Sequence, residues 1–187
     1  MSSKTKETQT LDPYVASASV QAGDETTQQK ISDLHKIIHD AGTSMLTTRD
    51  SAGHLHSRAM TPATPFSDDQ LGLFFIANTA SGKIDELEND TNVNVSFYDN
   101  ASTSWASYSG HAHIVDDRAV IKEHWSPAMA HFFRDLHDGV HTGDASDPRV
   151  IGIEVIPDDI HFFSAVPGVD ETVHVAPGRL HTITTEE

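Results

Sequence analysis

The sequence predicts a mainly β protein, an antiparallel β-barrel with a few helices at its rim. A hairpin over residues 43–60 is followed by four further strand-like runs, at residues 71–77, 93–98, 105–115 and 150–156. Most of these runs are joined by short turns, and few helices interrupt them. This order favours an antiparallel barrel over a doubly wound parallel sheet.

The hairpin is predicted from two runs around a glycine-containing turn. Residues 43–48 and 54–60 supply the strands, and residues 50–53, Asp-Ser-Ala-Gly, supply the turn. The later run 93–98 alternates apolar and polar side chains, so that its two faces differ. The apolar face should meet the core, and we expect the polar and aromatic face to meet another subunit. The three apolar residues of this strand are Val93, Val95 and Phe97.

Helices are predicted beside the strands. An amphipathic helix should run from Lys30 to Gly42, because apolar residues recur there at helical spacing and glycine commonly ends a helix. These apolar residues are Ile31, Leu34, Ile37 and Ile38. A second helix is predicted from about Asp117 to His131, and Pro127 should end or kink it. The following segment, 134–149, is rich in Gly, Asp and His and is predicted to be a loop.

Length and composition predict one domain with two tails. The 187 residues suffice for a single core but not for two full-sized domains. Residues 1–29 hold few large apolar side chains and are predicted to form a disordered arm. The barrel domain is expected over residues 30–165, and residues 166–187 are expected to form a C-terminal extension.

The charge excludes several kinds of partner. Lys and Arg total 12 against 28 Asp and Glu, a formal net charge of −16, which repels nucleic acid and anionic membrane surfaces. No run approaches the roughly 18 apolar residues of a membrane span. The chain has no cysteine, so a disulfide or a thiolate site is excluded. We therefore expect a cytoplasmic protein that binds neither nucleic acid nor membrane.

A polar turn at residues 78–83, Asn-Thr-Ala-Ser-Gly-Lys, follows the apolar run 71–77 and precedes a short helix predicted at Ile84–Leu87. Backbone N–H groups, the Ser81 hydroxyl and the Lys83 ammonium together suit a phosphate group. The sequence has neither the P-loop nor the dinucleotide-binding glycine pattern. The alternative interpretation is that Ser81 only caps the helix and Lys83 is a solvated surface cation.

Four segments in order resemble the pyridoxamine 5′-phosphate oxidase-like, FMN-binding split-barrel superfamily. They are TSMLTTRDSAGHLHSRAM, LGLFFIANTASGKIDELENDTNVNVSFYD, WASYSGHAHIVDDRAVIKEHWSP and DPRVIGIEVIPDDIHFF. The chain is most similar to the general-stress-protein branch, which includes fungal blue-light-inducible proteins. The resemblance implies a six-stranded antiparallel split β-barrel that forms a homodimer, with two FMN molecules bound at the subunit interface.

The resemblance also assigns site residues. Arg58 matches the arginine that takes the FMN phosphate, and Ser81 and Lys83 match the family's S-x-K pair on the same phosphate. Ile76 and Ala77 fall where backbone groups contact the pyrimidine edge of the flavin.

Further positions near the flavin ring follow from the same resemblance. Met60 falls where an apolar side chain packs near the ring, and Ala59 belongs to the same cofactor-binding stretch. Trp105 occupies the position from which the partner subunit reaches the flavin, and Phe163 that of a tryptophan near the ring edge. Both aromatic residues are equally compatible with packing in the core or at an interface.

Several positions depart from the family pattern. Many relatives carry Thr where this chain has Ala77 and Pro where it has Ala59. The true oxidase uses an additional lysine where this chain has Ala63. The tripeptide Arg179-Leu180-His181 matches the oxidase's element for substrate phosphate, but we interpret it as coincidental because the surrounding oxidase sequence is lacking. Oxidation of vitamin B6 phosphates is therefore not expected.

The expected function is that of a stress-related flavoprotein. FMN would carry hydride or electron transfer, with a reduced nicotinamide or another small organic molecule as reductant. The first alternative is a flavin-binding or flavin-buffering protein without catalysis, because no residue stands out as a general acid or base. The second alternative is a dimeric heme or deazaflavin binder on the same fold.

Two competing kinds of chemistry are a metal site and a serine hydrolase site. The pairs His54-Leu-His56 and His111-Ala-His113 have a spacing that can chelate a metal from a strand. In a chain with 13 histidines such pairs arise easily, so they are interpreted as hydrogen-bonded histidines at the surface or at an interface, and no metal site is predicted. A serine hydrolase is disfavoured because no G-x-S-x-G motif surrounds a serine.

Overall fold

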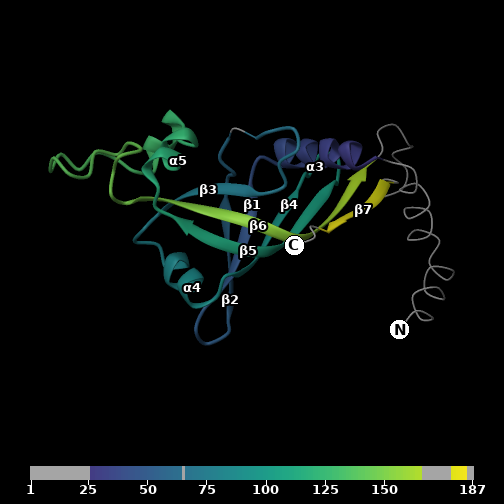
Figure 1. The fold of residues 1–187 in the computed structure, drawn as a ribbon, viewed down its shortest axis with the longest axis horizontal. Helices are drawn as coiled ribbons and strands as arrows, with labels where there is room; N and C mark the ends of the chain where they lie inside the picture. Colours follow the sequence, from purple (N-terminus) through teal and green to yellow (C-terminus); the bar gives the residue numbers. More distant parts are fainter. Residues whose placement is uncertain (1–25, 65, 166–177, 185–187) are drawn as a thin grey trace.

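The computed structural model describes residues 26–64 and 66–165, together with the backbone of residues 178–184. Its elements are α3 (Thr27–Ala41), β1 (Ser44–Arg49), β2 (Leu55–Met60), β3 (Leu73–Asn78), α4 (Lys83–Asn89), β4 (Asn92–Tyr98), β5 (Trp105–Val115), α5 (Arg118–Glu123), the 3-10 helix η1 (Pro127–His131), β6 (Val150–Ala165) and β7 (Gly178–Thr184). The strands cross the middle of the molecule, while α3 and α4 lie on opposite sides of it and α5 lies at one end (Figure 1).

All strand pairs are antiparallel, and they form one curled sheet in the order β2-β1-β4-β5-β6-β3, with β7 added to β6. The ends of this order, β2 and β3, are not paired as strands. One backbone bond links them, in which the Ala63 N–H, just after β2, donates to the Phe74 carbonyl over 2.7 Å. The prediction of a mainly β, six-stranded antiparallel split barrel is confirmed.

The inner face of the sheet and α3 enclose the main core. Val93, Val95 and Phe97 point inward as predicted, and Asn94, Ser96 and Tyr98 point to the other face. All four apolar residues predicted for the stripe of α3 are buried. The helix also ends as predicted, because Gly42 adopts a φ of 65°, in the left-handed region that favours glycine.

A second, smaller core explains why β3 is apolar on both faces. Leu73, Phe75 and Ala77 face the barrel interior, whereas Phe74 and Ile76 pack with Ile121 of α5 and with Phe133, Val150 and Ala63. Residues 73–77 are all buried, so the strand shows no alternation of apolar and polar side chains. The helical segment after β5 therefore packs on the outside of β3.

Three predicted boundaries need correction. The first helix begins at Thr27 rather than Lys30, because the Thr26 hydroxyl caps it by accepting a hydrogen bond from the Gln29 N–H over 3.2 Å. Residues 27–29, which were predicted as part of the N-terminal arm, therefore lie in the helix, and Thr26 caps it. The rest of that arm, residues 1–25, lies outside the described residues.

The helix predicted from Asp117 to His131 is two separate helices. The α-helix ends at Glu123, and Pro127 begins η1 instead of ending a helix. Proline is well suited to a first turn because the N–H that it lacks would have no partner within the helix there. Ser126 caps this turn by accepting a hydrogen bond from the Ala128 N–H.

The last strand of the barrel is also longer than predicted. β6 runs from Val150 to Ala165 instead of ending at Ile156, and its second half pairs with β7. Residues 178–184 of the expected C-terminal extension thus form a strand of the sheet. The backbone of the tripeptide at 179–181 lies in this strand, where position 180 pairs with Phe163.

Tyr108 has a buried hydroxyl with no hydrogen-bond partner among the described residues, and this burial raises the pKa of its phenol. Replacing Tyr108 by Phe removes the unpaired polar atom and keeps the ring that packs edge-on against Phe97. We expect Tyr108→Phe to stabilise the fold by about 1 kcal/mol, measured by urea denaturation. A loss of stability would show that the hydroxyl has a partner in solution.

Candidate functional site

A pocket of about 390 Å³ lies in the split between β2 and β3. Its volume is within the range of small-molecule sites, roughly 300 to 1,000 Å³. We call it the split pocket. Its lining residues are Ala59, Met60, Thr61, Ile76, Ala77, Asn78, Lys83, Ala128, Met129, Phe132 and Phe133. Five of the nine residues predicted for the site therefore line one pocket: Ala59, Met60, Ile76, Ala77 and Lys83.

The walls of the pocket are mostly apolar, and the charged side chain among its lining residues, Lys83, lies at one end. Met60 and Ile76 belong to the two strands, and Met129, Phe132 and Phe133 close the opposite wall from η1 and the residues after it. The aromatic and thioether side chains of this wall were not singled out from the sequence. In the sequence, these side chains were marked only by their apolar character within a segment predicted as helix and loop.

The strand β3 also offers backbone groups to the pocket. In an antiparallel strand the N–H and C=O of one residue point to the same side, and successive residues alternate. Ala63 bonds to the Phe74 carbonyl on the side away from β6, so the backbone groups of Ile76 point that way too. Those of Ala77 point toward β6, so of the two predicted backbone contacts only Ile76 is oriented toward the split.

Lys83 is the buried cation at the charged end of the split pocket. It is only 8% exposed, and its ammonium Nζ donates to the Ser81 hydroxyl over 2.8 Å. Burial lowers the pKa of Lys83, and the nearby Arg58 charge lowers it further. Lys83 is therefore not a solvated surface cation, and Ser81 does not cap α4, whose N-cap is Gly82 without a side-chain hydrogen bond.

Arg58 lies next to this pair and is bound on two sides. Its Nη2 donates to Glu86 Oε1 and its Nη1 to the Thr48 hydroxyl, each over 2.7 Å. Burial raises the pKa of the Glu86 carboxyl, but hydrogen bonds from Arg58 and Thr48 outweigh this, so that the pKa lies below its usual value. The structure thus places Arg58, Ser81 and Lys83 close together, and it adds Glu86 and Thr48, which the sequence analysis missed.

Trp105 and Phe163 lie elsewhere. They are cross-strand partners on β5 and β6, at the opposite end of β6 from the residues that pair with β3. Phe163 is buried, and Trp105 is partly exposed. Within one subunit neither residue belongs to the split pocket, so a role for Trp105 at the flavin requires a second subunit.

Three histidines of the two predicted pairs lie next to a carboxylate. His54 Nδ1 and His56 Nε2 lie 3.1 and 3.3 Å from Asp50 Oδ2, and His111 Nε2 lies 3.3 Å from Asp158 Oδ2. Among the described residues there is no group of three or more His, Cys, Asp or Glu side chains that could hold a metal ion. In that same part of the chain, no helix combines the length and the apolar character of a membrane span.

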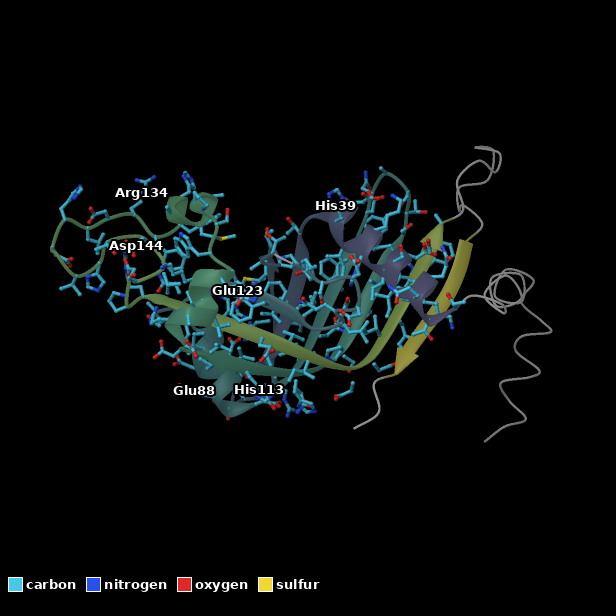
Figure 2. The ribbon with its side chains drawn as sticks, turned by 45° about the horizontal axis from the view of Figure 1, so that its top comes forward. His39, Glu88, His113, Glu123, Arg134 and Asp144 are labelled. Carbon is cyan, nitrogen blue, oxygen red and sulfur yellow. The ribbon has the colours of Figure 1, made fainter. Side chains whose placement is uncertain are left out.

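The aromatic wall of the split pocket depends on a buried ion pair. The loop after η1, which carries Arg134 and Asp144, extends away from the barrel (Figure 2). At its base the fully buried Asp147 accepts hydrogen bonds from Arg149 and from the Gly143 N–H. Arg149 in turn donates to the carbonyls of Phe133 and Arg134. The network fixes the backbone next to Phe133, which lines the pocket.

The fold is an open antiparallel barrel with a pocket in its split. A family model described as "Pyridoxamine 5'-phosphate oxidase like" matches residues 29–162, and the chain belongs to this family. "Protein bli-3" of Neurospora crassa is 45% identical over 128 residues, which make up 68% of this chain. The match spans 61% of the length of that relative.

Solved structures share the fold at low identity. The General Stress Protein 26 from Bacillus anthracis str. Sterne is 22% identical with a TM-score of 0.59, over 72% of this chain and 93% of that one. A pyridoxamine 5'-phosphate oxidase-related, FMN binding protein from Nostoc punctiforme is 16% identical with a TM-score of 0.59, over 86% and 97% of the two chains. At these identities the likeness establishes the fold alone.

Hydrogen bonds from Arg149 hold the pKa of Asp147 far below its usual value. A carboxyl with a lowered pKa in the folded state contributes stability above its unfolded pKa, about 4, and loses it as the pH falls below that value. We expect Asp147→Asn to destabilise the fold by roughly 1.5 to 3 kcal/mol at pH 7, and the difference from the unmodified protein to shrink in acid. Urea denaturation between pH 3 and pH 7 measures this.

The matched control is Asp144→Asn, an exposed carboxylate of the same loop whose hydrogen bond is local to Ser146. Its effect should stay within about 0.5 kcal/mol. An equal effect of the two substitutions would contradict a special role for the buried pair.

Proposed function

We propose that the split pocket binds FMN and that the protein is a stress-related flavoprotein. The observation that carries this proposal is the buried Lys83–Ser81 pair beside Arg58, at the charged end of an otherwise apolar pocket. Buried lysines normally have a carboxylate partner. Lys83 makes its hydrogen bond to a neutral hydroxyl instead, so its positive charge is suited to a bound anion.

The residues fit the three chemical parts of FMN. Two cations and a hydroxyl suit the phosphate, and the charge-assisted hydrogen bonds that they can donate are the stronger kind. The apolar walls suit the flavin ring, and the backbone groups of Ile76 suit its polar pyrimidine edge. The overall charge of −16 does not prevent such binding, because Lys83 and Arg58 act at contact distance.

FMN supplies hydride and electron transfer when bound, with a reduced nicotinamide or a small organic molecule as the proposed reductant. The chain's own residues would orient the ring and exclude water through Met129, Phe132 and Phe133. Among the residues that line the pocket there is no carboxylate, imidazole or phenol. Proton transfer at the flavin ring would therefore fall to solvent.

The same observation favours a second candidate, a protein that binds flavin without turnover. Both candidates share the phosphate site and differ in whether the bound flavin is reduced and reoxidised repeatedly. Oxidation of reduced nicotinamide by the FMN-loaded protein, measured by absorbance, separates them. Steady consumption supports the oxidoreductase, and one reduction per flavin or none supports storage.

Removing either cation should weaken FMN binding. We expect Lys83→Ala and Arg58→Ala each to cost roughly 1.5 to 3 kcal/mol of binding free energy, the value of a lost charge-assisted contact. Riboflavin, which lacks the phosphate, should bind the variants and the unmodified protein equally. Titration with quenching of flavin fluorescence measures both ligands.

The control is Lys122→Ala, an exposed cation on α5 outside the pocket, which should leave both affinities unchanged. The phosphate site is refuted if FMN affinity is unchanged in both pocket variants.

We further propose a homodimer formed through the outer face of the sheet. Met45 on β1 and Tyr98 on β4 are 41% and 57% exposed there, and Met45 pairs across the strands with Ala59, which lines the split pocket. Trp105 pairs with Tyr98 and so shares this face, because directly opposed residues of antiparallel strands point the same way. A second subunit packed here would border the pocket and receive Trp105.

A charge on this face should separate the subunits. We expect Tyr98→Glu to convert a dimer into a monomer, because burying an unpaired carboxylate opposes association. Analytical ultracentrifugation at several concentrations measures the change.

Leu136→Glu is the matched control, since Leu136 is 54% exposed but lies on the loop after η1. A dimer that survives Tyr98→Glu, or one that is lost equally in both variants, would place the interface elsewhere.

A further inference from the structure

Three side chains close a ring of hydrogen bonds beside the split pocket. Arg58 Nη2 donates to Glu86 Oε1, and Arg58 Nη1 donates to the Thr48 hydroxyl, both over 2.7 Å. The same Thr48 hydroxyl donates to the second carboxylate oxygen of Glu86. The three residues come from β1, β2 and α4, so the ring joins two neighbouring strands to the helix.

The ring is shielded from water. Thr48 is fully buried, and the side chains of Glu86 and Arg58 are 12% and 28% exposed. A carboxylate in such a place is stable only when it is paired and its oxygens are hydrogen-bonded, and both oxygens of Glu86 are. The arrangement holds the guanidinium of Arg58 in one orientation.

The ring uses the two terminal nitrogens of the guanidinium, Nη1 and Nη2, and does not use Nε. Arg58 Nη1 donates to Thr48 and, over 3.4 Å, to the His56 carbonyl, and Nη2 donates to Glu86. Within the described residues, the Nε–H has no hydrogen-bond partner. An arginine presents Nε–H and an Nη2–H side by side, and this edge matches two oxygens of a phosphate.

We propose that Glu86, together with Thr48, is a positioning residue that holds Arg58 so that its Nε edge faces the phosphate of the bound flavin. Glu86 does not touch the ligand and acts through Arg58. This inference rests on the proposed function and deepens it, since it makes the preference for FMN over riboflavin depend on a carboxylate. A carboxylate that only neutralised Arg58 would have the opposite effect, because its removal would strengthen binding of the phosphate.

The test is the ratio of riboflavin to FMN dissociation constants, measured by fluorescence quenching on the full chain. We expect Glu86→Gln to lower this ratio about tenfold, the equivalent of one weakened charge-assisted contact. In an Arg58→Ala background the same substitution should change the ratio less than about twofold, because a positioning residue has no effect without the residue that it positions.

Glu88→Gln is the matched control. Glu88 is an exposed carboxylate on the same short helix (Figure 2), and its removal changes the net charge equally. The ratio should be unchanged in this variant. A similar fall in both variants would mean that net charge, not positioning, sets the preference, and would overturn the inference.

Thr48 provides a second test with a rescue. Thr48→Val removes the hydroxyl at nearly constant volume and should lower the ratio, whereas Thr48→Ser keeps the hydroxyl and should retain it. Thermal denaturation of the flavin-free variants shows whether each one is folded, so that a loss of the fold is not mistaken for a loss of preference. Equal ratios in the Val and Ser variants would overturn the role of the ring.

The outcomes separate the inference from the proposed function. If the unmodified protein binds neither flavin, or binds both equally, the proposed phosphate site fails. If it prefers FMN, and Arg58→Ala removes that preference while Glu86→Gln keeps or strengthens it, the phosphate site stands. In that case only the positioning role of Glu86 is overturned.

Discussion

The pairing of β6 is the constraint on which the rest of the structure depends. This strand of 16 residues bonds to β5 along one edge and to β3 and then β7 along the other. β3 pairs with β6 along one edge, and its other edge faces β2 without pairing with it as a strand. The barrel is therefore split at the place where backbone groups, two apolar walls and the charged end of α4 meet. A closed barrel of these strands would have no such pocket.

Local electrostatics, and not the overall field, decide what this pocket can bind. The chain is strongly acidic, yet Arg58 comes close enough to Lys83 at one end of the pocket to lower the pKa of Lys83. Two other arginines of the barrel region are already paired: Arg49 with Asp90, and Arg118 with Asp116. The helix α4 has only seven residues, so the cations themselves, more than its dipole, supply the attraction. The carboxylate of Glu86 lowers the net positive charge at this end of the pocket and fixes the orientation of the Arg58 guanidinium.

Much of the fold and part of the site could be predicted from the sequence. The alternation in β4 and the spacing in α3 depend on neighbouring positions, so the pattern of one segment was sufficient. The pair Ser81 and Lys83 also lies within one turn of chain, although Lys83 is the first residue of α4, whereas the helix was predicted to begin at Ile84. The boundaries that were wrong, at Thr27 and around Pro127, depend on caps whose partners lie a few residues outside the apolar pattern. Arg58 was identified through the family resemblance alone.

The sequence by itself determined the class of fold, the membership of the family and the local chemistry of the turn before α4. The tertiary structure alone decided that Glu86 and Thr48 hold Arg58, that Phe133 and its neighbours line the pocket, and that Trp105 lies outside it. Glu86 lies 38 residues from Thr48 and 28 from Arg58. Contacts at such separations depend on strand register and on where a helix packs, and these arise only when the whole sheet has formed.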